Sequence, residues 1–144
     1  MRVRQIISLP ELEAAWRLVA DVLGQEDSHP RNYAFYANHF TLHPALLLVC
    51  LTDHGALAGA LLAHAEPDHV WIGKLAVLPT HRAAGAGSAL LSLLERNAAA
   101  AGHRRLMLGA SSGAEAFYAR RGYRATLLQR QSGRPPQCVF RKEL

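Results

Sequence analysis

Residues 75–88, which read LAVLPTHRAAGAGS, decide the fold of this chain. A strand-like apolar run stops at Pro79, a turn of small residues follows, and a helical pattern then begins. Apolar residues continue at helical spacing at Leu90, Leu91, Leu94 and Ala98. The first N–H groups of a helix lack intrahelical partners and carry partial positive charge, so such a junction is suited to phosphate. Gly85 and Gly87 would let the backbone approach the anion, and Arg82 would add a charged donor.

The turn differs from two other phosphate-binding loops. A Walker loop ends in Gly-Lys-Ser/Thr, whereas Gly87 is followed here by Ser88 and then alanine. A dinucleotide-binding loop needs a small residue where this chain has Leu90, and it lies near the start of a parallel sheet. A tight strand-to-helix turn without a ligand stays open as an alternative for the loop considered alone.

The remaining sequence predicts the order β-α-α-β-β-β-α-β-α-β-β, an α/β fold with one mixed sheet and helices on its faces. The expected strands cover residues 2–7, 45–52, 56–65, 69–78, 104–110, 123–129 and 137–142. The expected helices cover 9–23, an irregular stretch within 25–44, 88–101 and 113–121. Two capping boxes support this pattern, Ser8 with Glu11 and Ser112 with Glu115. Since no repeat or linker interrupts the order, residues 1–144 are expected to form one domain.

Composition indicates an ordinary globular protein. Half of the 144 residues are apolar and 19% are charged, a balance that excludes a disordered chain. The longest apolar run, residues 45–51, is far shorter than the ~18 residues of a membrane span, and the N-terminus lacks the pattern of a secretory signal. Cys50 and Cys138 are too few and too distant for a disulfide framework or a zinc site. We therefore expect a cytoplasmic protein with no bound metal and no membrane partner.

The net charge of +5 is unevenly distributed. From Arg104 onward there are nine basic residues and two acidic ones, whereas the preceding part has seven basic and nine acidic residues. Such an excess favours an anionic partner, either nucleic acid or a phosphate-rich small molecule. A nucleic-acid-binding domain ranks last, because the sequence has no helix-turn-helix, zinc pattern or aromatic RNA-binding strand motif.

Two motifs together resemble those of a known family. Val77-x-Pro79-x-x-Arg82-x-x-Gly85-x-Gly87-x-x-Leu90-Leu91 is similar to the coenzyme A-binding motif of the GNAT superfamily of N-acyltransferases, whose core is Arg/Gln-x-x-Gly-x-Gly/Ala. Ala114-x-x-Phe117-Tyr118-x-x-x-Gly122-Tyr123 resembles the second motif, a helix with a tyrosine that ends at Gly-Phe/Tyr. The expected order of elements also matches the family along essentially the whole chain.

The resemblance implies a central, mostly antiparallel sheet with helices on both faces. It also implies an acetyl-CoA-dependent N-acetyltransferase, which transfers an acetyl group to a primary amine by direct attack on the thioester. The acceptor would be a small-molecule or peptide amine. A non-catalytic module that binds acyl-CoA is the alternative, and a homodimer stays open.

The resemblance also assigns roles to individual residues. Backbone N–H groups in the turn would hold the pyrophosphate of coenzyme A, namely those of Ala83, Ala84, Gly85, Ala86, Gly87 and Ser88. The backbones of Leu75, Ala76 and Val77 would pair with the pantetheine arm, and an N–H near Val77 would stabilise the oxyanion. Tyr118 would protonate the departing thiolate, unless its ring only packs beside Phe117. Ser111 would contact the pantetheine, at a place where the family often has asparagine.

The base that deprotonates the acceptor is not evident. Family members often carry a glutamate near the position of Gly73 or Lys74, and neither residue is acidic here. The weak candidates that would act through water are His69, His64, Glu66 and Asp68, and each is more simply a turn residue facing solvent. Tyr33 and Tyr36 either line the acceptor pocket or belong to the core.

Overall fold

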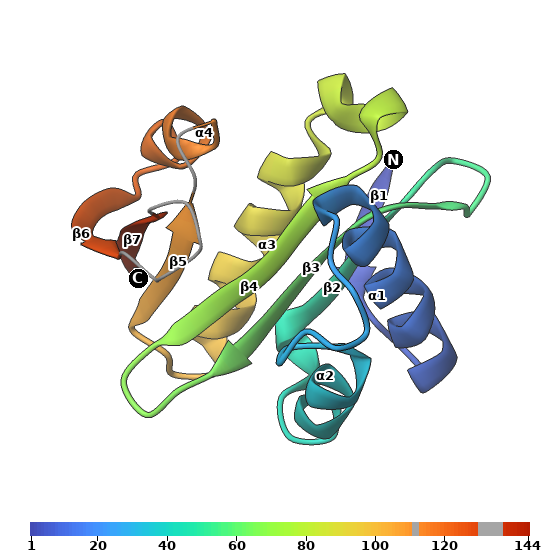
Figure 1. The fold of residues 1–144 in the computed structure, drawn as a ribbon, viewed down its shortest axis with the longest axis horizontal. Helices are drawn as coiled ribbons and strands as arrows, with labels where there is room; N and C mark the ends of the chain where they lie inside the picture. The colour runs from blue at the N-terminus through green and yellow to red at the C-terminus, as the bar shows by residue number, and fades with distance from the viewer. Residues whose placement is uncertain (111–112, 130–136) are drawn as a thin grey trace.

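The computed structural model describes residues 1–110, 113–129 and 137–144 (Figure 1). It contains a seven-stranded sheet in the order β1-β2-β3-β4-β5-β7-β6. The strands are β1 (Arg2–Gln5), β2 (Leu47–Leu51), β3 (Leu57–Ala65), β4 (Val70–Val77), β5 (Arg105–Ala110), β6 (Arg124–Gln129) and β7 (Gln137–Glu143). The helices are α1 (Leu9–Leu23), α2 (Tyr33–Phe40), α3 (Ala86–Ala100) and α4 (Glu115–Ala119), with 3-10 turns η1 (Pro44–Leu46) and η2 (Pro79–Ala84). The predicted order of elements is confirmed.

The sheet opens between β4 and β5, its single parallel pair among the strands described. These strands pair from Val70 opposite Leu106 to Ile72 opposite Leu108, and no further. Beyond this point β4 continues beside β3, and β5 continues beside β7 (Figure 1). We call the resulting space between the second halves of β4 and β5 the wedge.

Helices cover both faces of the sheet, as predicted. On one face, Trp16 of α1 and Tyr36 of α2 are fully buried against strands that include Leu62. On the other face, α3 lies against β1 to β4, and its Leu90 belongs to the same core as Leu106 of β5. Strand β2, the second strand in the sheet order, is buried along its entire length, which is expected for a strand covered on both sides. Among the helices described, none is long and apolar enough to cross a lipid bilayer.

The first capping box forms with a different partner from the one predicted. The Ser8 hydroxyl accepts the Glu11 N–H at 3.3 Å, as expected. The Glu11 carboxylate, however, accepts the N–H of Ile7 at 3.1 Å rather than that of Ser8, because Arg4 holds it bidentately at 2.7 and 2.8 Å. At the other end, Gly24 takes a left-handed conformation with φ 68° and ends α1.

Two predicted boundaries are wrong, and so is the predicted irregularity of the second helix. The helix expected from residue 88 begins at Ala86, and η2 replaces part of the expected loop because Pro79 starts a short 3-10 turn. The helix expected over 113–121 is limited to α4, whose N-cap is Ala114 and makes no side-chain capping bond. The irregular second helix is instead regular, and the side chain of Asn32 caps it. Ser111, Ser112 and the predicted turn at 132–136 lie outside the described residues.

Candidate active site

A cavity of about 280 Å³ lies at the mouth of the wedge. It is lined by Leu75, Ala76, Val77, Arg82, Gly87, Ala114, Phe117 and Tyr118. The lining residues come from β4, η2, α3 and the start of α4, so the fold brings the two sequence motifs together at one site.

The turn before α3, which the sequence predicts to bind phosphate, is open on one side and packed on the other. Gly85 caps α3 with φ 78°, and a Cβ built on it would meet no atom within 4 Å. Gly87 is different, because a Cβ there would lie 3.1 Å from the Phe117 ring. Gly87 therefore lets α4 approach α3, a packing role that the sequence did not predict. The first N–H bonded within α3 is that of Ala89, so the amides of Ala86, Gly87 and Ser88 precede the helical ladder.

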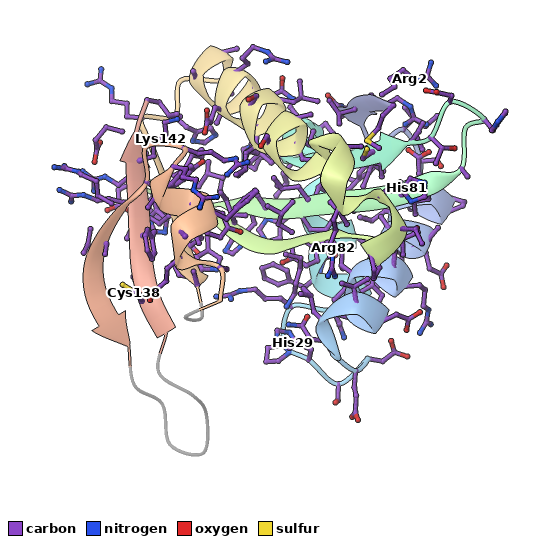
Figure 2. The ribbon with its side chains drawn as sticks, turned by 90° about the horizontal axis from the view of Figure 1, so that it is seen from above. Arg2, His29, His81, Arg82, Cys138 and Lys142 are labelled. Carbon is purple, nitrogen blue, oxygen red and sulfur yellow. The ribbon has the colours of Figure 1, made fainter. Side chains whose placement is uncertain are left out.

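Arg82 fastens the turn to the end of β4. Its Nε donates to the Val77 carbonyl at 3.1 Å, while the side chain also lines the cavity. Ala83 and Ala84 belong to η2, between Arg82 and the Gly85 cap. Figure 2 labels Arg82 near the middle of the molecule, away from Lys142 on β7.

The edge of β4 that faces the wedge offers N–H groups that pair with no strand among the described residues, whereas the Val77 carbonyl already accepts from Arg82. The Leu78 N–H donates to the Ala58 carbonyl of β3 at 2.8 Å. Because backbone groups of successive strand residues point to alternate sides, the N–H groups of Val77 and Leu75 point away from β3 and into the wedge. An extended ligand could therefore add to β4 along this edge.

Tyr118 combines a packed ring with an accessible position. Its residue is 9% exposed, and its ring stacks edge-on against Phe117 and Tyr123 with centroid distances of 5.1 and 5.7 Å. Burial raises the pKa of Tyr118 to about 12, and the charge of Arg121 has a lesser, opposite effect. The phenol is thus protonated at neutral pH, a state that can donate a proton but not accept one.

The hydroxyl of Tyr36 lies beside Gly73, one of the two positions near which the resemblance would place a glutamate. A Cβ built on Gly73 would overlap the hydroxyl of Tyr36, which is fully buried and has no hydrogen-bond partner among the described residues. Burial holds the pKa of Tyr36 well above its usual value. The neighbouring Lys74 is 3% exposed, and its Nζ lies 3.3 Å from Nε2 of His29 and 5.9 Å from the centre of the Trp16 ring.

Three of the four weak base candidates, Glu66, Asp68 and His69, lie in the turn between β3 and β4. The fourth, His64, lies on β3 and is buried rather than facing solvent. His69 contacts Asp68 at 2.7 Å, and the buried His64 contacts Glu66 at 2.9 Å. Six residues separate His69 from Leu75, where the cavity begins, which is about 20 Å along an extended strand. The structure therefore does not bring His69, the preferred candidate, to Tyr118, and a single bridging water cannot span that distance.

Side-chain contacts that were not predicted from the sequence hold the second motif against α3. Arg121 donates from Nε to the Ser88 hydroxyl at 2.8 Å, and Lys142 pairs with Glu95 at 3.1 Å. The hydroxyl of Tyr123 also donates to Glu95, at 3.0 Å. These bonds join residues far apart in sequence, so no local pattern could have predicted them.

Solved structures show the same fold. The chain matches Ard1 from Thermoplasma volcanium with a TM-score of 0.80 and 17% identity over 99% of this chain and 97% of that one. It matches Chaetomium thermophilum Naa20, solved in complex with a bisubstrate analogue, with a TM-score of 0.80 and 23% identity over 100% of this chain and 87% of the Naa20 chain. It also matches the N-acetylglutamate synthase from Neisseria gonorrhoeae, solved with coenzyme A and N-acetyl-glutamate. That match has a TM-score of 0.71 and 21% identity, and it covers 99% of this chain and 35% of the synthase chain.

Sequence comparison identifies the family. No curated protein matches the chain significantly in sequence. The model of the acetyltransferase (GNAT) family matches residues 11–123, a range that includes both motifs and most of the sheet. The mixed sheet, its open wedge and this match agree, and the chain belongs to the acetyltransferase (GNAT) family.

Proposed function

We propose that this protein is an acetyl-CoA-dependent N-acetyltransferase that acts on a primary amine by direct attack on the thioester. One observation carries the proposal. The cavity at the wedge joins a free strand edge, the N-terminus of α3 and the protonated phenol of Tyr118. Family membership supports acetyl transfer, and the coenzyme A bound to the structurally similar synthase supports the cofactor.

The residues present fit coenzyme A. The amides of Ala86, Gly87 and Ser88 and the guanidinium of Arg82 suit a diphosphate at the open side of Gly85. The cavity, at about 280 Å³, is near the lower limit of small-molecule sites, about 300 Å³, and thus suits a slender arm better than a bulky ligand. Backbone groups of Leu75 and Val77 would bind that arm as an added strand.

The chain's own groups then supply positioning, charge stabilisation and a proton. The bound cofactor contributes an acetyl group activated as a thioester. The N–H of Val77 or Leu75, which points into the wedge, would stabilise the oxygen that becomes negative when the amine attacks. Tyr118 keeps its proton at neutral pH and would transfer it to the departing sulfur.

A module that binds acyl-CoA without catalysis is the second candidate. The observation that favours it is the absence of an acidic side chain at Gly73 and Lys74, where a base was expected. Binding would then need the strand edge and the turn, but not Tyr118.

Binding and turnover separate the two candidates. Acetyl-CoA should raise the melting temperature, and release of free thiol with a panel of amines should reveal turnover. Gly85→Glu should abolish binding through bulk and negative charge, whereas the control Gly55→Glu should not. Gly55 has a similar φ of 82° and equally open surroundings at a turn before β3, so both variants carry the same strain. Stabilisation by acetyl-CoA without thiol release would favour the binding module. If Gly85→Glu keeps both acetyl-CoA binding and turnover, the proposed site is refuted.

A further inference from the structure

A second hollow lies between α3 and the α4–β7 side of the molecule, outside the wedge. Its volume is about 400 Å³, within the range of ligand sites. It is lined by Ser88, Leu91, Ser92, Glu95, Arg120, Arg121 and Lys142, and we call it the cationic groove. Ser88 belongs to the first turn of α3, so the groove starts where the proposed diphosphate site ends.

The groove has positive charge that the protein does not neutralise. Three of its side chains are cationic and one, Glu95, is anionic. Glu95 is already engaged, because Lys142 lies 3.1 Å from its Oε1 and Tyr123 donates to its Oε2. Within the described part of the chain, Arg120 and Arg121 have no carboxylate partner.

Arg121 is held in a fixed orientation at the boundary of the two hollows. Its guanidinium lies 3.6 Å from the centre of the Phe117 ring and donates to the Phe117 carbonyl at 2.7 Å. It also donates to the Ser88 hydroxyl. Because Phe117 lines the wedge cavity, Arg121 separates that cavity from the groove.

Arg120 is the adaptable member of the groove. Its side chain is exposed, and its guanidinium makes no hydrogen bond or ion pair with any residue that the structure describes. An exposed guanidinium that lines a hollow beside a fixed one offers donors that match the oxygens of a phosphate.

We propose that the cationic groove binds the 3′-phosphate of coenzyme A through Arg120 and Arg121. This inference rests on the proposed function, since the phosphomonoester is carried by the ribose next to the cofactor's diphosphate. A phosphomonoester has a charge of about −1.5 to −2 at neutral pH, which two guanidinium groups balance. Binding of this phosphate would also account for some of the excess of basic residues from Arg104 onward. Other cations of that part are engaged or distant, since Arg105 pairs with Glu143 at 2.9 Å and Arg124 lines a separate hollow.

The test compares coenzyme A with dephospho-coenzyme A, which differs only in the missing 3′-phosphate. Calorimetric titrations at low ionic strength should show that the wild-type protein binds coenzyme A about tenfold more tightly, the effect of one charged hydrogen bond. Arg120→Gln should reduce this preference and leave the affinity for dephospho-coenzyme A unchanged. Arg124→Gln, an exposed arginine outside the groove, should keep the preference.

Four results would overturn the proposal. The wild-type protein could bind both ligands equally, or Arg120→Gln could weaken both by the same factor, and in each case acetyl-CoA binding itself would stand. Binding of neither ligand would refute the proposed function and the groove's role together. A preference that survives in Arg120→Gln but disappears in Arg124→Gln would move the phosphate to another surface and also contradict the assignment.

Discussion

Replacing Tyr118 by phenylalanine removes one hydroxyl from the proposed site and little else. The edge-on ring contacts with Phe117 and Tyr123 remain, and the hydroxyl makes no hydrogen bond with the described residues. We therefore expect the free energy of unfolding at pH 7 to change by less than about 0.5 kcal/mol. Loss of a general acid should lower kcat by about 10²- to 10⁴-fold, which is roughly 3–5 kcal/mol of transition-state stabilisation.

The high pKa of Tyr118 adds a pH signature. The phenol titrates near 10 in the unfolded chain and at about 12 in the folded one. Its neutral form thus contributes stability that is fully present below pH ~10 and is lost as the pH rises towards the folded pKa, up to about 3 kcal/mol. Tyr118→Phe should lose less stability than the wild type over this alkaline range. Below that range, deprotonation of Tyr118 should not reduce the rate.

The assay is single-turnover thiol release, with acetyl-CoA affinity measured separately. Tyr123→Phe is the matched control, because it removes a neighbouring buried hydroxyl that donates to Glu95. That control should lose about 1.5–3 kcal/mol of stability, as expected for a hydrogen bond to a charged group, but should keep its turnover. Wild-type kcat in Tyr118→Phe, or a fall in kcat matched by an equal loss of acetyl-CoA affinity, would refute the role of general acid.

Two further substitutions test the buried positions near the sheet. Gly73→Ala would place a Cβ on the Tyr36 hydroxyl and should lower the free energy of unfolding, measured in urea, by about 1–3 kcal/mol. Adding Tyr36→Phe should restore part of the lost stability. A Gly73→Ala variant with unchanged stability would contradict this contact. Burial lowers the pKa of His64, so neutral His64 contributes stability above pH ~6.5 that is lost as pH falls through the folded pKa. His64→Leu should therefore reduce the fall in melting temperature between neutral and acidic pH, and an unchanged pH dependence would exclude His64 as its source.

Much of the fold could be predicted because local chemistry and tertiary structure agree. Ser8 and Gly24 mark the ends of α1, and both act as the caps that their residue types favour. The apolar run at residues 45–52 predicts a strand, and β2 lies within it, buried on both faces. The start of α3 was misplaced by two residues, because Gly85 rather than the turn's last glycine takes the left-handed conformation.

The site was less predictable, because its shape arises from long-range pairing. Nothing near Ile72 in sequence indicates that β5 stops pairing there, so the wedge is visible only in the structure. The contact of Tyr36 with Gly73 and that of Arg121 with Ser88 each join distant segments. The residue types of the two motifs indicate where the cavity lies in the chain. The positions of the side chains near it, by contrast, depend on how α2 and α4 pack.

The residues at positions 73 and 74 affect which kind of amine we expect as the acceptor. With glycine and a buried lysine at 73 and 74, neither strand position supplies a carboxylate to take the amine's proton. An alkylamine with pKa ~10.4 is only about 0.1% neutral at pH 7.5, whereas an α-amino group with pKa ~7.8 is about one-third neutral. At equal concentration the α-amine therefore presents roughly 300-fold more of the attacking form.

We therefore expect a peptide with only its α-amine free to be acetylated faster at neutral pH than one with only a lysine side chain free. The rate with the lysine peptide should rise about tenfold per pH unit until the amine's own pKa, because each unit raises the neutral fraction tenfold. The α-amine should instead reach a plateau near pH 8.5. Thiol release measured with both peptides between pH 6.5 and 9.5 tests this expectation. A lysine-peptide rate that does not change with pH would contradict the expectation, because a group of the protein would then remove the proton.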